Sequence, residues 1–156
     1  MGTPPPPEPN TAAGKPDDKP DPKARLRQDE WARIFRPSGV FLAGQVDTEH
    51  WLAAGLDGQL PAYFRGDKVL MSRHPVQTIL RLAPAADVRL SGLLWPEART
   101  RIADSAYVTV ERHGRGQVIL FAADPSYRMW FAGLQRLLLN AVLLGPGLGT
   151  DPPRPW

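Results

Sequence analysis

Two carboxylates and an imidazole fall within four consecutive positions, at Asp47, Glu49 and His50. Carboxylate oxygens and imidazole nitrogens are common ligands of zinc, so a divalent-metal hydrolase that uses these three residues is one hypothesis. The spacing is unfavourable, because ligands on one helical face lie three or four residues apart and Glu49 would point away from the other two. In the simpler interpretation Asp47 or Thr48 caps a helix and Glu49 favours its positive end.

Complete catalytic motifs are absent from the sequence. With no cysteine, disulfides, thiolate metal sites and a cysteine nucleophile are excluded. The patterns H-x-x-E, H-E-x-x-H, H-x-H and G-x-S-x-G do not occur. His74 precedes a proline and His113 lies in an expected turn, where both are most simply exposed. We therefore expect that this chain alone is not an enzyme, with no catalytic residue, metal or cofactor of its own.

Three further residues are candidates for binding a small ligand, namely Trp95, Asp124 and Arg128. Each lies at or just after the end of an expected strand, and open α/β sheets bind ligands at the carboxyl ends of their strands. The structural alternative is that Asp124 caps the last helix while Arg128 reaches a carboxylate or a backbone carbonyl and holds the corner.

The composition divides the chain into a tail, one domain and a short C-terminus. Eight of the 18 prolines lie before residue 23, among charged and small residues, so we expect 1–26 to be a disordered tail or linker. Residues 27–148 hold enough apolar residues for one core, and 149–156 are expected to be flexible. The net charge of +3 is spread along the chain, which disfavours nucleic-acid binding. No apolar run is long enough for a membrane span or a signal peptide, so we expect a soluble chain of unknown compartment.

Helical and strand periodicities alternate through the domain. Helices are expected over 27–35, 47–55, 96–103 and from Trp130 to Gly145, the last of them mostly buried. Strands are expected over 40–42, 61–64, 69–71, 76–82, 90–95, 107–112 and 117–122. The last two strands should form a hairpin, because glycines flank Arg115 between them. This alternation predicts an α/β fold in which helices flank a sheet.

Several segments, in this order, resemble the C-terminal part of large bacterial zinc carboxypeptidase-like proteins. The resemblance covers roughly residues 27 to 148 and rests on Phe35-Arg36-Pro37-Ser38-Gly39, Asp47-Thr48-Glu49-His50-Trp51-Leu52 with Gly55-Leu56, Leu90 to Ala98, Gly114 to Ala122 with Asp124-Pro125 and Arg128, and Leu139 to Pro146. In that family a class I glutamine-amidotransferase-like domain of flavodoxin-like topology follows the peptidase domain.

The resemblance implies a partial flavodoxin-like sheet and a non-catalytic role. The family's zinc ligands belong to the upstream peptidase domain, and nothing here matches them, so zinc is expected only there. The implied function is that of an accessory or interaction domain of a metallocarboxypeptidase-like protein. The implied partner is the upstream half, with self-association as the alternative. A self-standing flavodoxin-like module that binds a small ligand is a second possibility.

Overall fold

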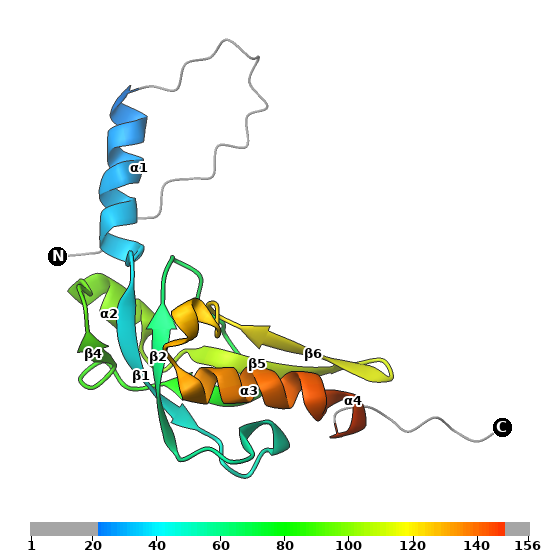
Figure 1. Ribbon diagram of the computed structural model, residues 1–156. Helices are drawn as coiled ribbons and strands as arrows, with labels where there is room; N and C mark the ends of the chain where they lie inside the picture. Colours follow the sequence, from blue (N-terminus) through cyan, green and yellow to red (C-terminus); the bar gives the residue numbers. More distant parts are fainter. Residues whose placement is uncertain (1–21, 149–156) are drawn as a thin grey trace.

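The computed structural model describes residues 22–148, which form an antiparallel sheet with helices packed around it (Figure 1). The elements follow in the order α1 (Pro22–Phe35), β1 (Val40–Val46), the 3-10 helix η1 (Trp51–Ala53), β2 (Gln59–Phe64), β3 (Gln77–Leu82), β4 (Arg89–Ser91), α2 (Pro96–Ile102), β5 (Ala106–His113), β6 (Gly116–Phe121), the 3-10 helix η2 (Tyr127–Met129), α3 (Ala132–Leu143) and α4 (Gly145–Leu148).

The strands lie in the order β2-β1-β3-β5-β6, and β4 pairs with β1 beside this path. The first part of β1 pairs with β4 at Phe41 and Leu42, whereas its last part pairs with β3 from Gly44 onward. Because β1 exchanges one neighbour for another along its length, the sheet curls around the core. Each pairing between these strands is antiparallel. The α/β class is thus confirmed, but the flavodoxin-like topology is not, because that topology has a mostly parallel sheet.

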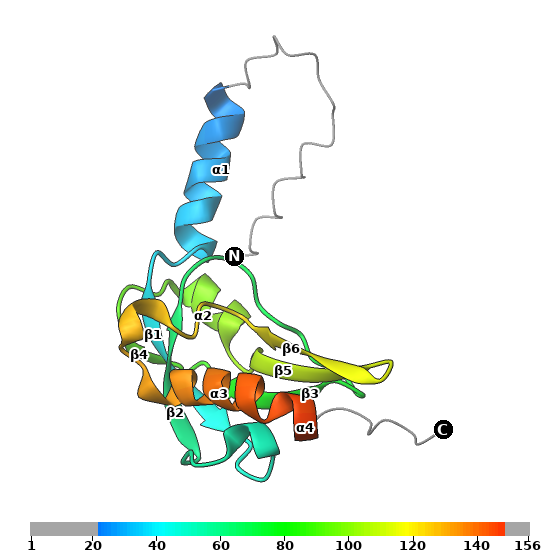
Figure 2. The same ribbon diagram turned by 45° about the vertical axis from the view of Figure 1, so that its right-hand side comes forward.

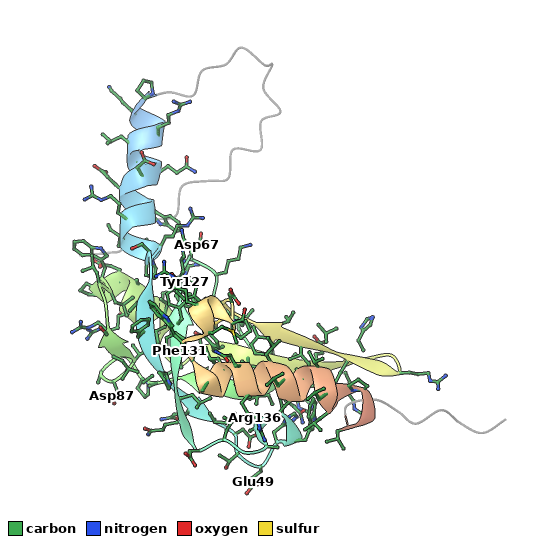
Figure 3. The ribbon with its side chains drawn as sticks, in the orientation of Figure 1. Glu49, Asp67, Asp87, Tyr127, Phe131 and Arg136 are labelled. Atoms are coloured by element: carbon green, nitrogen blue, oxygen red, sulfur yellow. The ribbon has the colours of Figure 1, made fainter. Side chains whose placement is uncertain are left out.

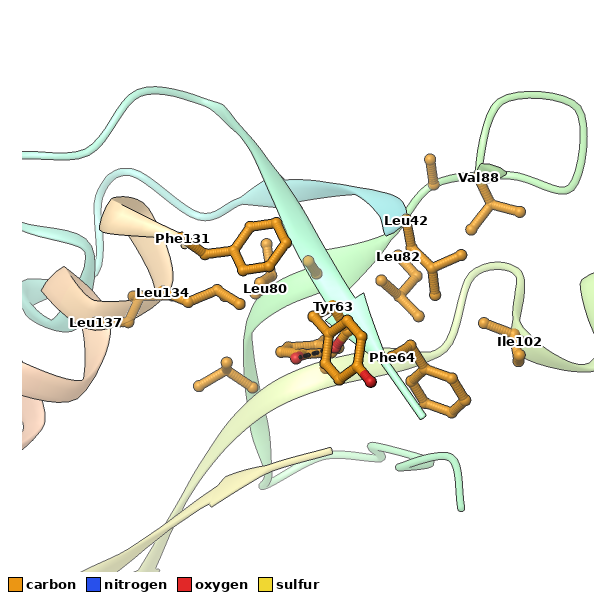
Figure 4. Packing of buried hydrophobic residues seen from close by; sticks show 14 of the residues in the cluster. Leu42, Tyr63, Phe64, Leu80, Leu82, Val88, Ile102, Phe131, Leu134 and Leu137 are labelled. Atoms are coloured by element: carbon orange, nitrogen blue, oxygen red, sulfur yellow. Dashed lines mark hydrogen bonds between the residues drawn. The ribbon is translucent and has the colours of Figure 1, made fainter. Parts of the chain in front are cut away.

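The core combines buried side chains of the sheet with others from α3 and α2. Figure 4 shows Phe131, Leu134 and Leu137 on one side of this cluster, and Val88 and Ile102 on the other. The buried Tyr107 hydroxyl donates a 2.6 Å hydrogen bond to the Tyr63 carbonyl oxygen, which ties β5 to β2 across the sheet. Burial raises the pKa of Tyr107 far above its usual range, so the phenol stays protonated and continues to donate.

The hairpin β5–β6 and the proline at the start of α2 were correctly predicted. Strands β2 and β3 also lie where the apolar patterns placed them, with boundaries one or two residues away. The helix α1 begins at Pro22, so it includes residues that the composition had assigned to the tail. The expected tail otherwise lies outside the described residues, as do residues 149–156.

Four expectations about the elements were wrong. The segment 47–55 is a turn followed by the short η1, because His50 and not Asp47 caps the helical residues. The segment 69–71 contributes only an isolated bridge between Leu70 and Ala106. The strand expected over 90–95 ends at Ser91, where Gly92 turns the chain with a φ of 94°. Finally, α3 is not mostly buried, because its side chains Leu139, Val142 and Leu143 are exposed.

The helix α1 projects away from the sheet, as two views show (Figures 1 and 2). Its base contacts α2, because the Arg101 guanidinium lies 6.0 Å from the centroid of the Trp31 ring, and within α1 this ring lies 5.1 Å from that of Phe35. None of the described helices is both long and apolar enough to cross a membrane.

Candidate functional site

The candidate metal residues are engaged in local structure. The Asp47 carboxylate accepts a hydrogen bond from the Glu49 backbone N–H, at 3.2 Å. His50 Nδ1 accepts from the Leu52 N–H at 3.1 Å and so caps η1, while His50 Nε2 lies 3.3 Å from Gln77 Oε1. Burial lowers the pKa of His50, although Gln77 and Asp47 act in the opposite direction. No cluster of three or more potential His, Cys, Asp or Glu metal ligands occurs within residues 22–148.

Trp95 lies at a different place from the other candidate ligand residues. It precedes α2 and lines a shallow depression of about 700 Å³ beneath α1, together with Leu26, Asp29, Arg33 and Leu93. Acidic and basic side chains mix along this depression, so it has no consistent charge. Neither Asp124 nor Arg128 lines this depression, so the structure does not place Trp95 in one site with them.

Asp124 and Arg128 belong to one turn between β6 and α3, but neither has the structural role that was predicted as the alternative to ligand binding. The Asp124 carboxylate accepts from the Ser126 N–H at 2.8 Å and from its hydroxyl at 2.7 Å. These bonds lower the pKa of Asp124, because they favour its charged form. The first turn of α3 has Phe131 as its N-cap, without a side-chain bond, so the expected Asp124 cap was wrong.

Arg128 contacts aromatic rings instead of a carboxylate or a carbonyl. Its guanidinium carbon lies 5.4 Å from the Tyr127 ring centroid and 5.2 Å from that of Trp130. Arg128 and Met129 both have positive φ, at 49° and 54°, a conformation that non-glycine residues adopt at a cost. The Tyr127 ring in turn stacks on Tyr63, with centroids 3.9 Å apart and planes 5° apart.

This aromatic cluster joins three parts of the chain that are distant in sequence. Tyr63 comes from β2, Phe41 from β1, and Tyr127, Trp130 and Phe131 from the segment around η2. Sequence reasoning missed it, because its ring contacts depend on the pairing of β1 with β2 and not on local spacing. Figure 3 shows Tyr127 near the base of α1 and Glu49 on the side of the domain away from α1, so the metal candidates and the cluster are separate.

A second feature that the sequence interpretation missed is the outward face of α3. Leu134 and Leu137 point into the core, whereas Leu139, Val142 and Leu143 are 53%, 63% and 71% exposed. We call these last three residues the outer stripe of α3. The apolar residues on all sides of this helix in the sequence already indicate such a face. A helix that is apolar all round must expose one apolar face when only one face meets the core.

The outer stripe cannot turn inward, because hydrogen bonds fix the rotation of α3. The buried Asn140 amide donates to the carbonyl oxygens of Leu52 at 2.8 Å and Ala54 at 3.0 Å. Arg136 Nε also donates to the Ala54 oxygen, at 3.3 Å. These bonds hold one flank of the helix against η1 and keep the outer stripe facing solvent.

Comparison with models of protein families, with curated proteins and with solved structures gives no match to this chain.

Proposed function

We propose that this chain is a non-catalytic interaction domain whose binding surface is the outer stripe of α3. The observation that supports this most directly is the exposure of Leu139, Val142 and Leu143 on a helix whose orientation is fixed by Asn140. Contiguous apolar side chains on a surface mark contacts with other polypeptides more often than isolated ones do. Burial of an exposed leucine contributes about 1.5–3 kcal/mol at most, so three such side chains can supply a substantial part of a binding free energy.

The proposed partner is the catalytic part of a metallocarboxypeptidase-like protein. This choice rests on the resemblance of the segments around Leu90–Ala98, Gly114–Ala122 and Leu139–Pro146 to the C-terminal part of such proteins. In this proposal the zinc site lies in the partner, and this chain positions the peptidase or its substrate. A flavodoxin-like topology would require the partner to supply the parallel strands of the sheet.

Co-purification tests this proposal. The tagged full-length chain, expressed in the organism that encodes it, should retain a protein with a zinc-peptidase H-x-x-E motif. The double variant L139K/L143K should lose that protein, because the lysines would have to be desolvated at the contact. The matched control V118K/L120K makes the same chemical change on a different exposed surface and should retain it. Equal recovery with L139K/L143K, or recovery of no such peptidase, would contradict the proposal.

Binding of a small anionic ligand is a second candidate function, favoured by the position of Arg128. Its side chain is exposed and lies over two rings, whereas the Arg36 guanidinium lies 3.7 Å from the Asp67 carboxylate. A planar carboxylate could therefore contact the guanidinium and stack beside Trp130. Titration with aromatic carboxylates, followed by Trp fluorescence, should show saturable quenching that R128Q removes. Quenching that is unchanged in R128Q would exclude this function.

A further inference from the structure

The free edge of β6 differs from the opposite edge of the sheet. Strand β2, at the other end of the strand order, carries Pro61 opposite Ala43, and a proline in an edge strand discourages further pairing. Strand β6 reads Gly-Gln-Val-Ile-Leu-Phe and contains neither a proline nor a charge. Its Val118 and Leu120 side chains are 42% and 48% exposed, although both belong to a regular hairpin. This edge therefore lacks the usual features that prevent strand addition.

The hydrogen-bond pattern of the hairpin shows which backbone groups are open on β6. The Ala122 N–H donates to the Tyr107 carbonyl at 2.8 Å, and bonded residues alternate along an antiparallel strand. Residues 118 and 120 therefore bond to β5, as Ala122 does. The N–H and C=O groups of Gln117, Ile119 and Phe121 point away from β5, toward the free edge.

From this pattern we propose that β6 pairs antiparallel with β6 of a second copy of the chain, about a two-fold axis at Ile119. In this register Ile119 faces Ile119 of the second copy and Gln117 faces Phe121. Each of these pairs exchanges two N–H···O bonds, so every open backbone group of the strand is used. Val118 faces Leu120 of the second copy on the same side of the sheet, and the two exposed apolar side chains cover each other.

The charges at the two ends of β6 suit this arrangement. Arg115 lies in the exposed turn before the strand, and Asp124 is exposed shortly after it. The same register brings Arg115 of one copy opposite Ala123 of the other, and so within reach of Asp124 through a long side chain. A parallel pairing would instead bring like charges together at each end. The charge distribution thus favours a second antiparallel copy over a parallel one.

Sedimentation velocity of the full-length chain over a concentration series tests this pairing. We expect a reversible monomer–dimer equilibrium, which V118K/L120K should weaken roughly tenfold or more because it places lysine opposite lysine across the axis. The variant R115E should weaken it less, and R25E, which makes the same charge change on the exposed α1, should leave it unchanged. Circular dichroism should show that all variants remain folded.

Three outcomes would overturn the pairing: a wild-type chain that stays monomeric at all concentrations, open-ended aggregation without a dimer, or a dimer that V118K/L120K leaves intact. This surface is separate from the outer stripe of α3. The variant L139K/L143K should therefore keep the dimer while it loses the peptidase partner, and V118K/L120K should do the reverse. Failure of one proposal is thus distinguishable from failure of the other.

Discussion

His50 shows at the scale of one residue how a candidate ligand can serve structure. Its neutral Nδ1 accepts from Leu52 N–H, and burial lowers its pKa below the usual 6.5. Near that pH the unfolded chain therefore binds more protons than the folded chain. The contribution of neutral His50 to the stability of the fold is fully present above the pKa that His50 has in the unfolded chain. It is lost as the pH falls through that value toward the lower pKa of His50 in the folded chain.

We expect H50N to remove this part of the pH dependence, because asparagine can also cap η1 but does not titrate. Urea denaturation at about pH 8 and about pH 5 measures the change in the free energy of unfolding. The loss between the two pH values should be smaller in H50N than in the wild type. An equal loss would show that His50 is not the titrating group.

Asn140 is the residue on which the orientation of α3 depends most directly. We expect N140A to lower the free energy of unfolding by about 1–3 kcal/mol, since it leaves the carbonyl oxygen of the buried Leu52 without this donor and removes one of two donors to the Ala54 oxygen. Thermal denaturation measures this loss. The exposed L139A provides a control on the same helix and should change stability by about 0.5 kcal/mol or less. Equal effects of the two substitutions would contradict the assigned roles.

Residue types alone predicted the candidates at these positions but not their partners. Asp47, Glu49 and His50 are close in sequence, so their proximity was predictable, whereas the Gln77 contact to His50 required the pairing of β1 with β3. Arg128 stays a predicted ligand-binding residue, and its contacts with Tyr127 and Trp130 depend on two residues of positive φ that no sequence pattern indicated.

At the scale of elements, close packing between β1 and β3 depends on Gly44. A Cβ atom at Gly44 would lie 2.7 Å from Leu80 Cδ1, within the core. We expect G44A to lower the free energy of unfolding by about 1–3 kcal/mol through overpacking, and the double variant G44A/L80V to recover part of it. The control G58A has no atom within 4 Å and should have little effect. Denaturant unfolding of the wild type, G44A, L80V and G44A/L80V would show no coupling between the two positions if the strands pack differently.

Local patterns predicted the hairpin β5–β6 and the helix α3 well, because the turn glycines and the apolar spacing are contained within each segment. They failed at 47–55 and 90–95, where tertiary interactions decide the outcome. In the first segment His50, whose ring also contacts Gln77 of β3, caps the helical residues and starts them late. In the second segment Gly92 approaches the Gly39 carbonyl so closely that a Cβ atom on Gly92 would lie 3.1 Å from it.

For the whole molecule, the sequence predicted the class of the fold but not the direction of its strands. Apolar residues on both faces are typical of buried parallel strands, and β5 has this pattern, with Ala106–Val110 buried. Here an antiparallel strand has the same pattern, because the curled sheet surrounds the core. Strand direction is set by the connections and by pairing, neither of which appears in the periodicity of one segment.

The outer stripe of α3 should contribute little to the stability of the chain itself. We expect L139K/L143K to change the free energy of unfolding by no more than about 0.5 kcal/mol, because both side chains already contact solvent. The core variant L134A should in contrast cost about 2–5 kcal/mol. Guanidinium denaturation of the three chains compares them. A large loss in L139K/L143K would mean that these leucines belong to the core.

The measurement that tests the central claim most directly is site-specific photo-crosslinking from position 143 in the organism that encodes the chain. A photoreactive residue there should yield an adduct with a protein that carries a zinc-peptidase motif, and mass spectrometry would identify it. The same residue at position 25 of α1 should yield none. Absence of an adduct at position 143, or equal adducts at both positions, would contradict the assignment of the outer stripe of α3 as the binding surface.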